Sequence, residues 1–263
     1  RPPRSTLFPY TTLFRSDTIA NATAANVTDL NALIADTDGT VTATIDGNYA
    51  QLSSITATAG DTGTSTLTIT VDDAVTAAQG NTALGLTDGT VIYGGGVSDT
   101  FANVVNAGAG AVSTNMGNID AADADVAVAI TDTIANATAA NVTDLNALIA
   151  ATDGTVTATI DGNAEQLASL TATAGDTGTS TLTITVDDAA TAARGAAIAD
   201  ATDASTVDFS AAGVSDTFAN VVAAGTGAVS ANMAKIDAKD ADVAVTITDT
   251  IANATAANVT DLN

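Results

Sequence analysis

The stretch TDGTVTATIDGN at residues 37–48 decides the class of fold, and it returns unchanged as residues 152–163. Apolar residues from Val41 to Ile45 alternate with threonines, a two-residue period that is typical of a β-strand rich in β-branched side chains. Asp46 follows directly, before the chain turns. The same order, a strand pattern and then aspartate, recurs along the chain.

A second strand pattern lies in TATAGDTGTSTLTITVDDA, which occupies residues 56–74 and returns as residues 171–189. Apolar residues from Leu67 to Val71 alternate with threonines, and Asp72 follows. Shorter alternations occur at residues 91–93 and 126–130. Because aspartate after a strand is where a βα unit places its helix cap, we expect these aspartates to cap the helices that follow. The stretch between one occurrence of these patterns and its return then divides into four βα units of about 29 residues each.

Two longer blocks have the three- and four-residue spacing of an amphipathic helix. The first spans residues 17–35, and we expect Asp17, or Thr18 beside it, to cap its N-terminus. The second candidate spans residues 97–119 and contains three glycines, each of which costs a helix about 1 kcal/mol relative to alanine.

Self-comparison divides the chain into copies of one long repeat. The copies span residues 17–131 and 132–248, and residues 249–263 begin a third. The offset between equivalent residues is 115 at first, and it becomes 117 after a segment that is two residues longer in the second copy. Near-identity of this kind indicates recent duplication, so we expect a window on a much longer tandem array.

Strands that alternate with helices predict an α/β fold with a parallel sheet and right-handed crossovers. Because a further copy begins at Asp249, we favour an open repetitive βα solenoid in which neighbouring repeats of the same chain pack on one another. Two alternatives stay open. One is a closure like a (βα)₈ barrel, which needs roughly 250 residues and eight strands. The other is an all-β repeat, which the glycines of residues 97–119 would suit.

Residues 1–16, RPPRSTLFPYTTLFRS, differ in composition from everything that follows. They hold all three prolines and three of the six basic residues. The string STLFPYTTLFRS resembles the conceptual translation of a sequencing adapter, a contaminant of metagenomic assemblies. We therefore predict a non-native, disordered leader on a metagenomic fragment, with no contribution to the fold.

The chain is strongly acidic and lacks two residue types on which much catalysis depends. It has 30 acidic and 6 basic residues, a formal net charge of −24, and neither histidine nor cysteine. The usual general base near neutral pH, the thiol nucleophile and the common zinc ligands are therefore missing, and we predict that the protein is not an enzyme. The charge predicts no nucleic-acid partner. No apolar run approaches 18 residues, which predicts no membrane insertion.

Clusters of aspartate are the pattern that points to a ligand, because Ca²⁺ prefers hard oxygen ligands at short spacing. The candidate ligands are Asp120, Asp123 and Asp125 in DAADADV, matched by Asp237, Asp240 and Asp242 in DAKDADV. Neither string matches an EF-hand loop or the glycine-rich nonapeptide of calcium-binding β-helices. The alternative interpretation is that these aspartates serve as caps and solvated turns, with no cofactor.

ITDTIANATAANVTDLNALIAATDGTVTATI and VSDTFANV resemble tandem repeats of very long, acidic, cysteine-free secreted or surface proteins of bacteria. These include adhesin-like and haemolysin-type calcium-binding repeat proteins, and the resemblance covers essentially all of residues 17–263. It implies an extracellular or cell-surface location and a structural or adhesive role, with an unknown surface or matrix partner. It also makes a calcium-responsive extracellular binding module the alternative function. It carries no catalytic residue to transfer.

Overall fold

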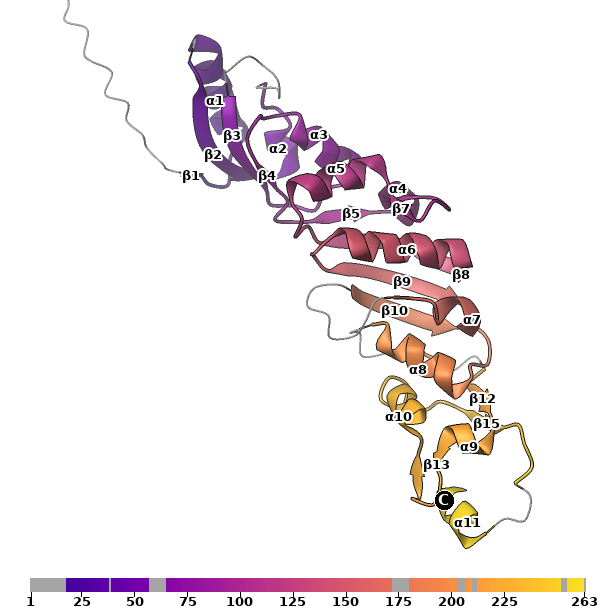
Figure 1. Ribbon diagram of the computed structural model, residues 1–263. Coiled ribbons are helices and arrows are strands. Elements are labelled where there is room, and N and C mark those ends of the chain that lie inside the picture. The colour runs from indigo at the N-terminus through magenta and orange to yellow at the C-terminus, as the bar shows by residue number, and fades with distance from the viewer. Residues whose placement is uncertain are drawn as a thin grey trace, which may run out of the picture.

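The computed structural model is an elongated α/β molecule in which short strands alternate with helices (Figure 1). It describes residues 18–37, 39–56, 65–171, 180–202, 207–209, 212–251 and 255–262. The elements up to residue 122 are β1 (Thr18–Ile19), α1 (Ala24–Asp36), β2 (Val41–Gly47), α2 (Tyr49–Leu52), β3 (Ser65–Val71), α3 (Ala77–Leu84), β4 (Val91–Ile92), β5 (Val97–Asp99), α4 (Phe101–Val104), β6 (Val105–Asn106), β7 (Ala111–Val112) and α5 (Thr114–Ala122). The later elements are β8 (Val128–Ala137), α6 (Ala139–Ala151), β9 (Val156–Gly162), α7 (Ala164–Leu167), β10 (Ser180–Val186), α8 (Ala192–Asp200), β11 (Val207–Asp208), β12 (Val214–Asp216), α9 (Phe218–Val221), β13 (Val222–Ala223), β14 (Ala228–Val229), α10 (Ala231–Asp237), β15 (Val245–Ile247) and α11 (Ala256–Leu262).

The strands of the two main sheets run parallel, as the sequence predicts. One sheet has the order β1-β2-β3-β4 and the other β11-β10-β9-β8-β5. β2 and β3 pair along their whole length, from Val41 with Ser65 to Gly47 with Val71. The prediction of an open α/β arrangement is therefore confirmed, because the described ranges form neither a closed barrel nor an all-β repeat.

Successive turns of this solenoid, each a strand with its helix, are not stacked at a constant level. Val75 pairs with Val97, Val97 with Val128, Val128 with Val156, and Val156 with Ser180. Val75 and Ser180 therefore lie at the same level along the strand direction. Ser180 lies ten residues before Ala190, the counterpart of Val75 in the second copy. Each copy is thus displaced along the strand direction by ten residues, at most about 33 Å. The steps range from 22 to 31 residues, from Val75–Val97 to Val97–Val128, so the predicted equal units of about 29 residues are wrong.

One face of each sheet is buried in the core and the other carries threonine. Leu67, Ile69 and Val71 are fully buried, whereas the threonines between them are half-buried. The helices add apolar stripes to the same core, such as Val27 and Leu30 of α1. Full burial of one such side chain contributes about 1.5–3 kcal/mol, so this alternation orients the sheet.

The helix predicted over residues 17–35 begins later than expected. α1 starts at Ala24, and Thr23 is its N-cap. Thr18 lies instead in strand β1, which pairs with β2, so the prediction that it caps the helix is wrong. The other cap candidate, Asp17, lies outside the described residues. Thr18 and Ile19 form a strand instead of the first turn of a helix because their backbone N–H and C=O groups can pair with those of β2.

The helix predicted over residues 97–119 is replaced by several short elements. β5 and α4 come first, β6 and β7 form an antiparallel hairpin, and α5 follows. Gly108 and Gly110 in the hairpin turn have φ angles of +73° and +63°, a conformation that glycine adopts without steric cost. A continuous helix cannot contain this turn.

The described helices are short. The longest, α1 and α6, have 13 residues each. Nowhere in the described ranges is a helix long and apolar enough to cross a membrane, as the sequence predicts.

Candidate functional site

Small polar side chains cap the starts of the helices. The side chain of the N-cap residue accepts a hydrogen bond from a backbone N–H three residues later at Thr23, Asn48, Thr76, Ser113, Thr138, Asn163, Thr191 and Ser230. Each of these bonds satisfies one of the backbone donors that a helix N-terminus leaves free. None of these N-caps is aspartate.

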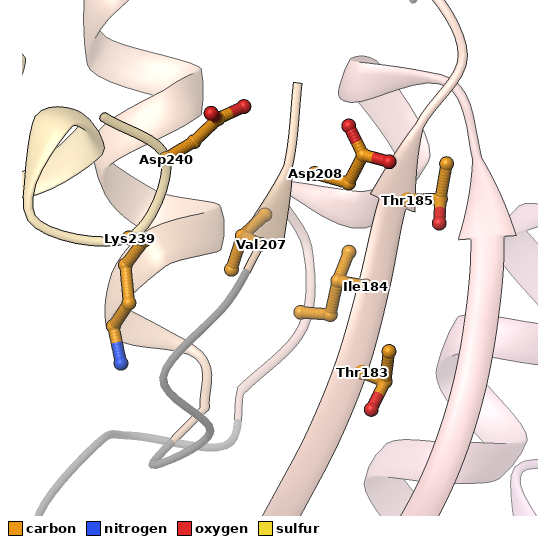
Figure 2. A pocket seen from close by; sticks show the side chains of 7 residues that line it. All are labelled: Thr183, Ile184, Thr185, Val207, Asp208, Lys239 and Asp240. Atoms are coloured by element: carbon orange, nitrogen blue, oxygen red, sulfur yellow. The ribbon is translucent and has the colours of Figure 1, made fainter. Parts of the chain in front are cut away.

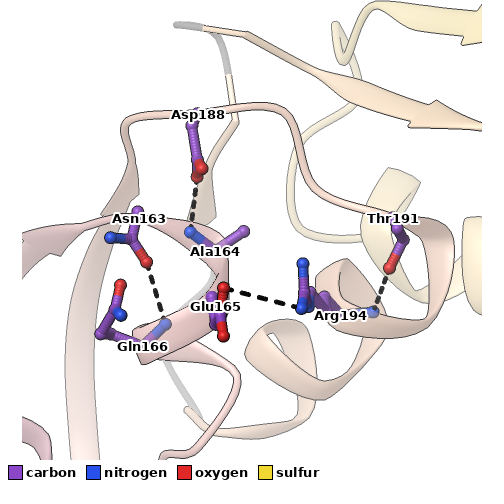
Figure 3. Close-up of polar contacts among 7 residues, drawn as sticks. All are labelled: Asn163, Ala164, Glu165, Gln166, Asp188, Thr191 and Arg194. Carbon is purple, nitrogen blue, oxygen red and sulfur yellow. Dashed lines mark hydrogen bonds and ion pairs between the residues drawn. The ribbon is translucent and has the colours of Figure 1, made fainter. Parts of the chain in front are cut away.

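Aspartates satisfy a second free donor from the neighbouring turn. For the helices of the first copy, Asp73 accepts from the N–H of Tyr49 at 2.7 Å, Asp99 from Ala77 at 3.0 Å and Asp132, at the start of the second copy, from Phe101 at 2.7 Å. For the helices of the second copy, Asp188 accepts from Ala164 at 2.6 Å, Asp216 from Ala192 at 3.0 Å and Asp249, at the start of the third copy, from Phe218 at 2.7 Å. We call these contacts inter-turn caps. Figure 3 shows Asp188 reaching the first residue of α7, beside the N-cap bond of Asn163.

The prediction that an aspartate after a strand caps its own following helix is therefore wrong at these positions. Asp73 follows β3, yet it caps α2, the helix of the preceding turn. The reason lies in the parallel sheet. Helices that follow the strands of one parallel sheet start at the same edge of that sheet, and neighbouring strands are only about 4.8 Å apart, so a short carboxylate reaches the adjacent helix. Its negative charge also meets the positive end of that helix.

Asp216 shows the electrostatics of an inter-turn cap most clearly. It is buried, and it accepts hydrogen bonds from the side chain of Asn220 at 2.7 Å and from the N–H groups of Thr217 and Ala192. Burial alone raises the pKa of this carboxyl, but the three hydrogen bonds outweigh burial and hold the pKa below its usual value of 3.8. The ionised form is thus the one that the fold selects.

Asp144 was not a candidate from the sequence, yet it holds the hairpin of β6 and β7. Its two carboxylate oxygens accept the N–H groups of Gly108 at 2.6 Å and Gly110 at 2.8 Å, and the residue is 1% exposed. Asp261, in the third copy, binds the corresponding glycines of the second copy in the same way. Those hydrogen bonds lower the pKa of Asp261. An aspartate on the apolar face of a predicted helix was the signal that could have found it.

Two of the six calcium candidates bind backbone N–H groups. Asp123 accepts from the N–H of Tyr93 at 2.7 Å, and Asp240 accepts from that of Phe209 at 2.8 Å. The remaining side chains differ in exposure: Asp125, Asp237 and Asp242 are exposed, and Asp120 is half-buried. Across the described ranges no three acidic side chains are placed to hold a metal ion. Calcium binding at these residues stays a prediction.

Asp120 is the candidate with an unusual environment. One of its carboxylate oxygens is buried and has no hydrogen-bond partner. Burial and, to a smaller degree, the charge of Asp153 raise its pKa. Asp72, which was not a candidate, has its pKa raised by burial and then by Asp46 and Asp73. At neither residue do the described side chains form a group of three acidic residues that could hold a metal ion.

A groove of about 360 Å³ lies beside β10 (Figure 2). Its lining consists of Thr183, Ile184, Thr185, Val207, Asp208, Lys239 and Asp240. The ammonium of Lys239 donates to the carbonyl of Thr202 at 3.0 Å. The first copy has Ala122 in place of this lysine, so the ammonium group is not a property of the repeat.

The threonine face of the sheet is regular in both copies. In the second copy Thr157 pairs with Thr181 and Thr159 with Thr183 across neighbouring strands, and all four are exposed. Strand spacing of about 4.8 Å and a two-residue repeat of about 6.6 Å give a grid of hydroxyl and methyl groups. The threonines are held stiffly, because β-branched side chains have few rotamers. Aspartates continue the same face, since Asp161 and Asp208 lie on either side of Thr185.

No family model, no curated protein and no solved structure matches this chain.

Proposed function

We propose that this chain is a non-catalytic structural or adhesive repeat segment of a large secreted or cell-surface bacterial protein. The observation that carries the proposal is the set of inter-turn caps. Six aspartates are hydrogen-bonded between turns, three for the helices of each copy, which suits an array under mechanical load better than a reaction site. The resemblance to long acidic surface proteins supports the same role and an extracellular location.

The threonine face is the surface that we assign to adhesion. Thr157, Thr159, Thr181 and Thr183 are exposed on it, and it repeats with the copies, so its contact area grows with the length of the array. Hydroxyl groups on a fixed grid suit a hydroxyl-rich matrix such as a polysaccharide, because each contact is weak and many act together.

The test is retention of beads coated with the full chain on polysaccharide and on collagen surfaces under flow. Thr157→Lys with Thr181→Lys should abolish retention on polysaccharide. The control, Thr28→Lys, adds a positive charge at an exposed position of α1, away from the threonine face, and should retain it. If the control also loses retention on polysaccharide, the added positive charge and not the threonine face explains the loss. If no surface retains wild-type beads, the adhesive role is wrong and only the structural role stands.

The structural role is tested separately by pulling single chains from both ends. A load-bearing array should unfold in discrete steps, and Asp99→Ala should lower the force of one step. Smooth extension at low force would contradict a structural role. The alternative function, a calcium-responsive binding module, requires calcium to raise these forces where sodium at equal ionic strength does not.

A further inference from the structure

The turn of the β6–β7 hairpin is shaped to bind a carboxylate. We call this turn, residues 107–110, the hairpin tip. Gly108 and Gly110 both have positive φ angles, and their backbone N–H groups donate to the two carboxylate oxygens of Asp144 at 2.6 and 2.8 Å. Backbone N–H groups that converge in this way form a common kind of anion site.

The two sides of this contact belong to different copies of the repeat. The hairpin lies in the first copy, whereas Asp144 lies on α6 in the second copy, 34 to 36 residues later. The contact recurs one copy further along the chain, where Asp261 accepts from Gly225 and Gly227. The hairpin tip therefore couples one copy to the next.

The hairpin is anchored at its base and exposed beyond it. Val105 at the base is 3% exposed, whereas residues 106–111 are all exposed. Two residue pairs join β6 to β7. A two-stranded hairpin is at best marginally stable by itself, so its contacts with the rest of the protein decide whether it stays in place. The two hydrogen bonds to Asp144 fasten its outer half to α6.

The elements around Asp144 carry no basic residue. Those packed against α6 are β6, β7, β8 and α7, and their titratable residues are Asp132 and Glu165, both exposed. α6 itself has no other charged residue. The glycine N–H groups, and not a cation of these elements, therefore stabilise the charge of the buried carboxylate.

A proton on Asp144 would remove the fit between the carboxyl group and the hairpin tip. A protonated carboxyl has an O–H donor on one oxygen, so at one of the two glycines a donor would face a donor. At the equivalent contact, the hydrogen bonds from Gly225 and Gly227 lower the pKa of Asp261, so the ionised form is the one bound. A contact of this kind is present at neutral pH and is lost as the pH falls through the native pKa.

We propose that the β6–β7 hairpin is an acid-opened flap, in which protonation of Asp144 releases the hairpin tip from α6 while the sheet stays folded. Opening loosens the contact between consecutive copies and unfolds neither of them. This inference concerns a conformational switch and does not rest on the proposed function.

Hydrogen exchange of the full chain tests the flap, with each rate divided by the intrinsic rate at the same pH. Protection of residues 106–111 should fall about tenfold or more as the pH falls from 7 to 3, whereas β9 keeps its protection. Asp144→Asn should lose the hairpin protection already at pH 7 and show no further loss in acid. Asp125→Asn, a matched change at an exposed position, should behave as wild type. If β9 loses protection together with the hairpin, or the hairpin does not respond to pH, the proposal is overturned.

A second variant tests the carboxylate site itself. Asp144→Ala removes the carboxylate and leaves space for a small one, so sodium formate should raise the protection of residues 106–111 several-fold over sodium chloride at the same ionic strength. Wild type should not respond to formate, because Asp144 already occupies the hairpin tip. Equal protection of Asp144→Ala in the two salts would mean that the hairpin tip does not recognise a carboxylate, and the proposal would be wrong.

Discussion

The carboxylate of Asp99 accepts a hydrogen bond of 3.0 Å from the backbone N–H of Ala77, which is the first residue of helix α3 in the preceding turn of the solenoid. Both residues are buried, so water cannot replace this contact. A buried N–H without a partner costs about 1–3 kcal/mol. The pair therefore joins two turns with a bond that neither turn can make alone.

We expect Asp99→Ala to lower the free energy of unfolding by about 1–3 kcal/mol, because it leaves the Ala77 N–H without a partner. Urea unfolding of the full chain measures the change. Asp125→Ala removes the same charge at an exposed position and should change the free energy by less than about 0.5 kcal/mol. Equal losses in both variants would mean that total charge, and not the inter-turn cap, decides stability.

Asp144 and Asp261 make the same two hydrogen bonds at different depths. Asp144 is 1% exposed and Asp261 is half-buried. We expect Asp144→Ala to destabilise the chain by about 2–4 kcal/mol, because two N–H groups lose their acceptor away from water. Asp261→Ala should have a much smaller effect, since water can hydrate Gly225 and Gly227. Thermal melting of the two variants compares them directly, and a larger loss at Asp261 would contradict this account.

Acid should weaken the fold through Asp216. Folding lowers its pKa below 3.8, so the ionised carboxylate contributes stability above about pH 4, and this contribution is lost as the pH falls through the native pKa. Asp216→Asn should therefore be less stable than wild type at pH 7, with the difference shrinking towards pH 2. Urea unfolding across this range, with Asp242→Asn as an exposed control, measures the pH dependence. If the difference in the free energy of unfolding stays constant with pH, Asp216 stabilises the fold through its packing and not through its charge.

Calcium and sodium should stabilise the chain nearly alike at matched ionic strength, because screening acts on all the carboxylates together. A specific calcium site would add about 2.7 kcal/mol at 100 times its dissociation constant. Melting in both salts distinguishes the two cases. A calcium-specific rise that Asp123→Ala and Asp240→Ala abolish would support the calcium-responsive module instead.

Deleting residues 1–16 should leave the melting temperature unchanged, because their composition does not belong with the repeat. The comparison is a thermal melt of the full chain and of the chain that begins at Asp17. A drop of several degrees would mean that these residues pack on the first copy.

The period of the side chains predicted the strands well and the connections poorly. The alternation from Val41 to Ile45 and its counterpart in β3 predicted two neighbouring parallel strands, because a two-residue period reports which face is buried. The hairpin at Gly108 and Gly110 was missed because apolar spacing alone does not distinguish a helix from short elements joined by glycine turns. The glycines were visible in the sequence, but the buried partner that holds them is 34 residues or more away.

The aspartates show the same limit at the candidate site. Aspartate after a strand predicted a capping role, and that chemistry is present. Which helix it caps depends on the distance between neighbouring strands, a property of the folded sheet that no local window of sequence contains. For the same reason the spacing within DAADADV could not indicate that Asp123 faces Tyr93, thirty residues earlier.

The displacement of each copy by ten residues along the strand direction affects the length of the molecule. Four strands stacked directly on one another would advance each copy by about 19 Å. Because each copy is also shifted sideways along its strands, the same number of residues spans a greater length, and the chain is drawn out obliquely, as Figure 1 shows. Duplicating one copy of this design therefore lengthens the solenoid with fewer residues per nanometre than a straight stack would require.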